Sequence, residues 1–217
     1  MSARAAEDKP LRVGIVCEGQ RGCAEMQVLP RLVRLICPEA LCGHSEIVPS
    51  GNRPKVLKQA PIVARDLLKS GCDVVFVFWD VFPEWRDEGG STDCKVHRKT
   101  FDEGLAAAKL TGQPIIPVAI HEELEAWLLC DADALTAVIG PLPKKKPIAH
   151  EKAPDQVKNP KSVIKKLFQR GRGTTYNESF SASQIAAKLT SVKRLRKSQS
   201  FKRFEDRLRA LCDEKAQ

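Results

Sequence analysis

Acidic side chains follow three apolar segments of this 217-residue chain. Glu18 ends the first segment and Asp80 ends the second, whereas the third leads directly into Glu122, Glu123 and Glu125. Open α/β sheets bind their ligands at the carboxyl ends of the strands. If the three segments are strands of one parallel sheet, their acids lie together at one edge of that sheet.

Carboxylates crowded in this way repel one another and need a counter-charge. Carboxylate and water oxygens are the preferred ligands of Mg²⁺ and Mn²⁺, so the residue types indicate a hard divalent cation rather than zinc. Such an ion can bind phosphate, lower the pKa of a nucleophilic water and neutralise the charge that develops in phosphoryl transfer. Glu25, early in the next expected helix, either folds back over the same edge or is a solvated first-turn glutamate.

Each acid also has an ordinary structural role. Glu18 can cap the helix that follows it, and Asp80 can be a turn residue after a strand. Glu122 and Glu123 suit the first turn of a helix, where carboxylates interact favourably with the helix dipole. Three acidic strand ends in one chain nevertheless favour a metal site over three separate coincidences.

Strands and helices alternate along the first 140 residues. Apolar runs typical of strands covered on both faces span residues 11–17, 73–80 and 114–120, with a shorter run at 47–48. Helical spacing or capping residues predict helices after residue 19, over 54–71, over about 100–110 and over 131–140. This alternation predicts an α/β protein with a Rossmann-like parallel sheet of about four strands.

Composition changes abruptly near residue 140. Residues 1–140 carry 16 Lys and Arg against 20 Asp and Glu, whereas residues 141–217 carry 20 against 7. Five prolines fall within 141–160, and helices are expected near 161–169, 183–189 and 199–212. We therefore divide the chain into a metal-binding domain, 1–140, and a basic helical region, 141–217. The basic region indicates either a polyanionic partner or a solvated, lysine-rich helical surface.

The remaining composition excludes several classes of protein. No apolar run approaches the roughly 18 residues that span a bilayer, and the polar first ten residues resemble neither a signal peptide nor an anchor. The eight cysteines include no C-x-x-C pair, and Cys94 with His97 is the nearest metal-like pattern. We expect reduced thiols in a cytoplasmic protein. No P-loop is present, so the chain should not hydrolyse ATP itself.

The order of these acids resembles the TOPRIM domain, the metal-binding fold of topoisomerases, primases and OLD-type (overcoming lysogenization defect) nucleases. The shared pattern is an apolar strand ending in Glu18-Gly19, an acid in the next helix, a strand ending in Asp80 and a later Glu-x-Glu. More closely, the sequence His121-Glu122-Glu123-Leu124-Glu125-Ala126 resembles the HEFEA motif of a TOPRIM-like bacterial family of unknown function. The tail from Asn159-Pro160-Lys161 to Ser200-Phe201 is similar to that family as well.

This resemblance implies a Mg²⁺-dependent nuclease that cleaves or nicks DNA or RNA. Such proteins are commonly coupled to an ABC- or AAA-type ATPase, and antiphage defence is the setting usually inferred. Lys161 would neutralise phosphate charge. Carried over by position, the metal ligands or acid/base residues would be Glu18, Glu25, Asp80, Glu123 and Glu125.

Two departures from the TOPRIM pattern put catalysis in question. The usual Asp-x-Asp reads Asp80-Val81-Phe82, so one ligand is missing unless Glu84 or Asp87 replaces it. The turn between Glu18 and Glu25 is also longer than usual. The alternative function is a non-catalytic TOPRIM-like adaptor or regulatory subunit that binds an ATPase partner or nucleic acid.

Overall fold

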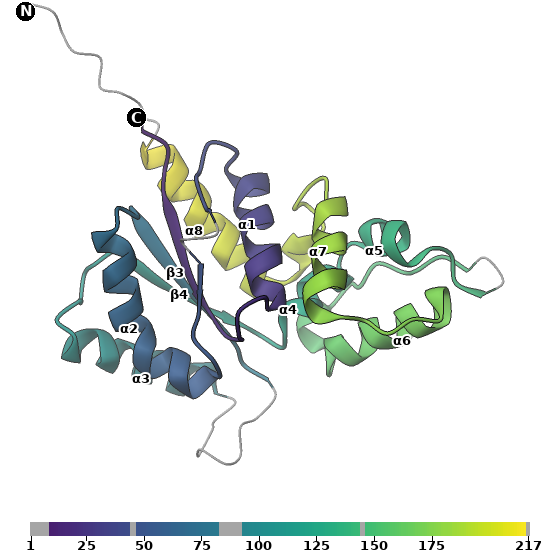
Figure 1. The fold of residues 1–217 in the computed structure, drawn as a ribbon, viewed down its shortest axis with the longest axis horizontal. Coiled ribbons are helices and arrows are strands. Elements are labelled where there is room, and N and C mark those ends of the chain that lie inside the picture. The colour runs from purple at the N-terminus through teal and green to yellow at the C-terminus, as the bar shows by residue number, and fades with distance from the viewer. Residues whose placement is uncertain (1–8, 44–46, 83–92, 144–145, 216–217) are drawn as a thin grey trace, which may run out of the picture.

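The computed structural model describes residues 9–43, 47–82, 93–143 and 146–215. These residues form four strands and eight α-helices, which alternate as far as the fourth strand and are followed by five helices, as Figure 1 shows. The strands are β1 (Val13–Cys17), β2 (Ile47–Pro49), β3 (Val74–Asp80) and β4 (Ile115–Ile120). The helices are α1 (Ala24–Ile36), α2 (Arg53–Lys69), α3 (Cys94–Ala107), α4 (Leu124–Leu129), α5 (Ala132–Ile139), α6 (Pro160–Arg172), α7 (Glu178–Lys188) and α8 (Gln199–Lys215).

All four strands run parallel in the order β2-β1-β3-β4, which confirms the Rossmann-like α/β prediction. The chain leaves β1 toward β2 on one side and then crosses over to β3 and β4 on the other. The strand order therefore reverses between β1 and β3, and ligands in such sheets bind at this reversal, beyond the carboxyl ends of the strands. Glu18 and Asp80 lie at the ends of these two strands.

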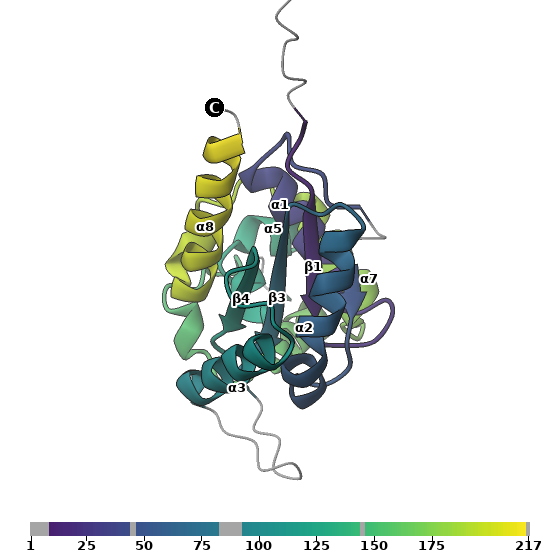
Figure 2. The same cartoon turned by 90° about the vertical axis from the view of Figure 1, so that its left-hand side faces the viewer.

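Both faces of the sheet are covered, so the central strands are apolar on both sides. Figures 1 and 2 show α1 and α8 on one face and α2 and α3 on the other. Within β3, Phe76 and Phe78 join the core beneath α1 and α8, whereas Val75, Val77 and Trp79 join the core beneath α2 and α3. This alternation has the period of two that strand geometry imposes.

The C-terminal helix α8 is anchored to the sheet by aromatic rings. Phe204 contacts Phe76 and Phe78 edge to face, with ring centroids 5.2 and 5.1 Å apart. Phe201 packs in the same way against Trp127 of α4, at 5.2 Å. The Trp127 indole N–H donates to the hydroxyl oxygen of Ser200 at 3.0 Å, which satisfies a buried donor.

One hydrophobic core runs through both parts of the sequence. Ile164, Phe168, Ile185 and Leu208 from the basic region belong to the same buried cluster as Val13 of β1. Residue 140 therefore marks a change in composition. That it is also a boundary between two domains stays a prediction.

Helices α3 and α7 begin earlier than the sequence predicts, because single capping residues decide where they start. Helix α3 begins at Cys94, where the Asp93 carboxylate accepts the backbone N–H of Lys95 at 2.8 Å. Helix α7 begins at Glu178 after Asn177, whose side chain accepts the N–H of Phe180 at 2.8 Å. Such caps satisfy N–H groups that have no partner within the helix.

Helix α6 extends past its expected end at residue 169 to Arg172, and Gly173 follows it in the left-handed region. Gly171 lies inside the helix, and a Cβ on it would come within 2.3 Å of the Ile139 side chain. Glycine therefore serves here for the close approach of α5 and α6 rather than for a turn.

The prediction that all the thiols are reduced is wrong for one pair. Cys37, after α1, and Cys212 of α8 form a disulfide across 175 residues of sequence. The two cysteines meet because α8 packs beside α1, which their sequence positions do not reveal. No second disulfide forms among the described residues. No helix in the described segments is long and apolar enough to cross a membrane.

We expect Phe204→Ala to lower the free energy of unfolding by about 3–5 kcal/mol, because it removes a fully buried ring from the α8–sheet contact. Arg207→Ala is the matched control, since Arg207 is exposed on the same helix, and should change stability by less than about 0.5 kcal/mol. Urea denaturation followed by circular dichroism measures both. If Phe204→Ala were as stable as the native protein, the packing of α8 on the sheet would not contribute to stability.

Candidate functional site

A pocket of about 470 Å³ opens at the carboxyl ends of β1 and β3. Most of the predicted site residues line it, from elements far apart in sequence. They are Glu18, Glu25, Asp80, Glu123 and Lys161. Gly19, Gln20, Cys23, Gly51, Asn52, Lys55, Phe82 and Glu178 complete the lining.

Glu18 and Asp80 are joined directly across the reversal of strand order. The backbone N–H of Asp80 donates to Oε2 of Glu18 at 2.6 Å. Val16 and Val77 are paired in register just before the two acids, so the parallel ladder brings the two strand ends together. The N-cap of α1 is Cys23, so the Glu18 carboxylate binds the end of β3 rather than capping the helix that follows.

Gly19 allows the chain to turn sharply after Glu18. Its φ of +107° is in the region that glycine tolerates, and a Cβ there would lie 2.6 Å from the Cβ of Cys23. The same Cβ position lies 3.6 Å from Oε2 of Glu25. Glu25 thus folds back from the first turn of α1 over the end of β1, which favours the first of its two sequence interpretations.

Arg53 is a buried cation beneath the pocket, and no sequence pattern predicted its role. Its side chain is 1% exposed. The guanidinium donates to the carbonyl oxygens of Asp80 at 3.0 Å and Val81 at 2.5 Å. Arg53 therefore fixes the backbone on which the Asp80 carboxylate stands, and its charge also favours the ionised form of Glu18.

Glu123 and Lys161 form the opposite wall of the pocket. Glu123 precedes α4 and accepts the backbone N–H of Lys161 at 3.1 Å. The Lys161 ammonium lies 3.5 Å from Oε1 of Glu123 and 3.4 Å from Oε2 of Glu178. Burial lowers the pKa of Lys161, but the surrounding acids, with Glu125 foremost, outweigh it and raise the pKa above its ordinary value.

Glu125 lies behind the pocket wall rather than in its lining. It is 2% exposed and accepts the hydroxyl of Tyr176 at 3.0 Å. Burial raises the pKa of Glu125 to about 7, opposed by the charge of Lys161. Burial and the nearby Glu125 raise the pKa of Tyr176 as well, so its hydroxyl stays a proton donor.

The acids of the pocket would repel one another if all were ionised, and the pKa values of three of them are raised. Burial raises the pKa of Glu18 to about 7, against the opposing effect of the Asp80 N–H. Burial and the neighbouring Cys23 raise the pKa of Glu25 to about 8. Burial, followed by the charges of Glu18 and Glu25, raises the pKa of Asp80 well above its usual range. A cation bound among these groups would relieve the repulsion.

The donor chemistry of the pocket fits Mg²⁺ or Mn²⁺, because every acid offers carboxylate oxygens and their charge lacks full compensation. In the described part of the chain, however, no three acidic, histidine or cysteine side chains are already gathered around one point that could hold an ion. Glu123 and Glu125 are engaged by Lys161 and Tyr176. Glu18, Glu25 and Asp80 are therefore the acids best placed to bind a cation.

Glu122 and His121 do not line this pocket. Glu122 is buried and points to Lys158, whose ammonium lies 3.2 Å from its Oε1. His121 is exposed and lines a different cavity, beside β4 and α8. The proposed substitute ligands Glu84 and Asp87 lie outside the described residues.

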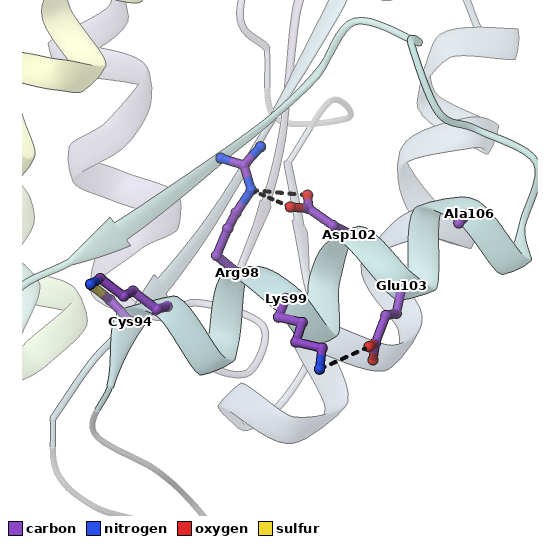
Figure 3. Close-up of a pocket in the computed structure, with 7 residues that line it drawn as sticks. Cys94, Arg98, Lys99, Asp102, Glu103 and Ala106 are labelled. Carbon is purple, nitrogen blue, oxygen red and sulfur yellow. Dashed lines mark hydrogen bonds and ion pairs between the residues drawn. The ribbon is translucent and has the colours of Figure 1, made fainter.

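Another surface depression, along α3, carries no comparable chemistry. It is lined entirely by one face of that helix, shown in Figure 3. Its charged side chains pair along the helix, Arg98 with Asp102 at 2.8 Å and Lys99 with Glu103 at 3.9 Å. These exposed pairs are ordinary surface contacts of small energy.

Some basic side chains of the C-terminal region form ion pairs with acidic residues of the same chain. Arg194 contacts Asp131 at 3.0 Å. Arg196 and Arg209 both contact Glu205 at 2.8 Å, and these bonds hold the pKa of the Glu205 carboxyl below its usual range against the effect of burial. These ion-paired residues stabilise the fold and need no polyanionic partner. For them, the interpretation as a helical surface without such a partner is sufficient.

The fold and pocket define an α/β protein with a carboxylate-lined site at the reversal of strand order. The chain belongs to the family described as a domain of unknown function, DUF4276, which matches residues 35–209. The matched region contains Asp80, Glu123 and Lys161, whereas Glu18 and Glu25 precede it. No curated protein and no solved structure matches the chain.

Some residues of the pocket have roles that depend on tertiary position and that no local sequence pattern predicts. Arg53 and Lys55 follow the helix-capping Asn52, and only the capping pattern could have drawn attention to this segment. Tyr176 and Glu178 belong to a loop and a helix that reach the pocket from the basic region. Nothing in their local sequence marks them as partners of Glu125 and Lys161.

The raised pKa of Glu25 predicts a pH-dependent stability. The native carboxyl keeps its proton up to about pH 8, whereas its ordinary pKa is 4.5. The unfolded chain loses the proton first as pH rises, so stability falls between about pH 4.5 and 8. In EDTA, Glu25→Gln should be more stable than the native protein at pH 8.5 by at least about 1 kcal/mol, with no such gain at pH 4.

Glu39→Gln provides the control, because Glu39 is exposed and distant from the pocket. Its unfolding free energy should follow that of the native protein at every pH. If Glu25→Gln also followed the native curve, the carboxyl would not be buried among the other acids.

Proposed function

We propose that this protein is a Mg²⁺- or Mn²⁺-dependent nuclease that hydrolyses phosphodiester bonds in DNA or RNA. The observation that carries the proposal is the meeting of Glu18, Glu25 and Asp80 in one pocket at the reversal of strand order. A divalent ion bound there would supply a nucleophilic water of lowered pKa and neutralise charge on the phosphate. The resemblance of the acidic motifs to TOPRIM domains supports the same chemistry.

The residues of the chain have distinct roles in this proposal. Glu18 and Asp80 hold the cation, and Arg53 keeps the end of β3 in place beneath them. Glu25, whose pKa lies near 8, can hold or release a proton close to neutral pH. Lys161 and Tyr176 orient Glu123 and Glu125 behind these groups.

The proposal also covers the cellular location, the biological role and the partner of the protein. We propose that the protein acts in the cytoplasm as the effector subunit of an antiphage defence system, with an ABC- or AAA-type ATPase as partner. The resemblance to the TOPRIM-like family is the support for this setting. Exposed basic side chains of the C-terminal region would contact nucleic-acid phosphates, with binding that weakens as salt rises.

A specific observation favours the second candidate, a non-catalytic adaptor. Val81 is 2% exposed, and Phe82 lines the pocket where the usual TOPRIM pattern has a second aspartate. Neither side chain offers an oxygen ligand. If Glu18, Glu25 and Asp80 are too few to hold a cation, the pocket would bind a partner without cleaving it.

Incubation of the full-length protein with supercoiled plasmid and with labelled RNA, in Mg²⁺ or Mn²⁺, tests the two candidates. We expect metal-dependent cleavage that Asp80→Asn and Glu18→Gln each lower at least about 100-fold, because each removes a charged ligand of the cation. Glu103→Gln, on the exposed face of α3, is the control and should cleave normally.

Each reaction is run with and without any ATPase whose gene lies next to that of the protein. Cleavage that survives both pocket substitutions would contradict the proposed site. Intact nucleic acid under all conditions, together with metal-independent binding, would favour the adaptor.

A further inference from the structure

Two lysines line the pocket, Lys55 and Lys161, and their surroundings differ. We propose that Lys55, at the start of α2, binds the phosphate group of the substrate strand, whereas Lys161 is an internal counter-ion of the acids. This inference rests on the proposed function, because it deepens the description of the same pocket. It also changes the role that the sequence predicted for Lys161.

Lys161 is ion-paired with two carboxylates of the protein. Its ammonium lies within 3.5 Å of Glu123 and 3.4 Å of Glu178, and its side chain is 26% exposed. Its backbone N–H is bonded to Glu123 too, so the start of α6 is fixed to the start of α4. A phosphate oxygen could reach this ammonium only in competition with two carboxylates.

Lys55 is exposed at the start of α2. Within the residues that the structure describes, no carboxylate forms an ion pair with it. Its side chain nevertheless lines the same pocket as Glu18 and Asp80. An ammonium without an internal partner binds a phosphate oxygen without first breaking an ion pair, and lysine is a common phosphate-binding residue.

Glycine at position 51 makes room for the Lys55 stem. Gly51 has a φ of +81°, and a Cβ on it would lie 3.1 Å from Cδ of Lys55. Gly51 and Gly19 exchange two backbone hydrogen bonds, 2.6 and 2.9 Å long. The aliphatic part of the Lys55 side chain therefore lies along Gly51. Gly51 is bonded to Gly19, the residue that follows Glu18.

The charges of the pocket explain why a second cation is needed. A phosphodiester is an anion, and the acids of β1 and β3 repel it unless positive charge lies nearby. A bound divalent ion supplies that charge on the acidic side, and Lys55 supplies it at the start of α2. The resulting site takes a single phosphate group of a nucleic-acid strand.

Binding of a fluorescein-labelled single-stranded DNA 12-mer with phosphorothioate linkages, in Mg²⁺, tests the inference by fluorescence anisotropy. We expect Lys55→Ala to weaken binding about 5- to 10-fold and to reduce the salt slope by about 0.7, as expected for one lost phosphate contact to a single strand. Lys55→Arg should retain most of the affinity.

Lys58→Ala is the matched control, because Lys58 is exposed on the same helix but does not line the pocket. Its affinity should remain within twofold of the native value. Lys55→Ala should melt at the native temperature, whereas Lys161→Ala should melt lower, because it leaves Glu123 and Glu178 without a counter-ion.

The outcomes separate this inference from the proposed function. If the native protein cleaves nucleic acid and Lys55→Ala binds the 12-mer as tightly as the native protein, the role of Lys55 is overturned and the nuclease proposal stands. If the native protein neither binds nor cleaves nucleic acid, calorimetric titration with inorganic phosphate decides. Phosphate binding that Lys55→Ala abolishes supports the subsite alone, and no phosphate binding overturns it.

Discussion

The repulsion among half-buried carboxylates at the ends of β1 and β3 is the constraint around which the rest of the site is arranged. Parallel pairing of these two strands brings Glu18 and Asp80 into direct contact, with the Asp80 N–H bonded to the Glu18 carboxylate. Positive charge surrounds this cluster: Arg53 lies beneath it and Lys161 beside it. The negative charge that remains uncompensated is what makes the pocket suitable for a cation.

The basic C-terminal region completes this arrangement instead of forming a separate appendage. Helix α6 supplies Lys161, and the loop before α7 supplies Tyr176, so two polar partners of the Glu-x-Glu pair come from this region. Helix α8 covers one face of the sheet through Phe201 and Phe204. Removal of residues 141–217 would expose that core, so point substitutions are the informative way to dissect this region.

The Cys37–Cys212 disulfide further ties the two parts together, since it links the end of α1 to α8. In the chain-entropy account, a bridge that closes so long a loop stabilises the fold by restricting the unfolded chain. A disulfide is unusual in a reducing cytoplasm. The proposed cytoplasmic location and this bond therefore have opposite implications for the redox state of the protein.

The sequence by itself determined the strands, their parallel arrangement and the acidic residues at their ends. It could do so because continuous apolar runs and strand–helix alternation are local patterns that survive without tertiary information. The prediction of helix starts at α3 and α7 failed, because single capping residues decide them. Only the tertiary structure decided that Arg53 lies under Asp80, that Lys161 is held by Glu123 and Glu178, and that Cys37 meets Cys212. Each of these contacts joins residues far apart in the chain, and their pairing depends on how helices pack on the sheet rather than on any local pattern.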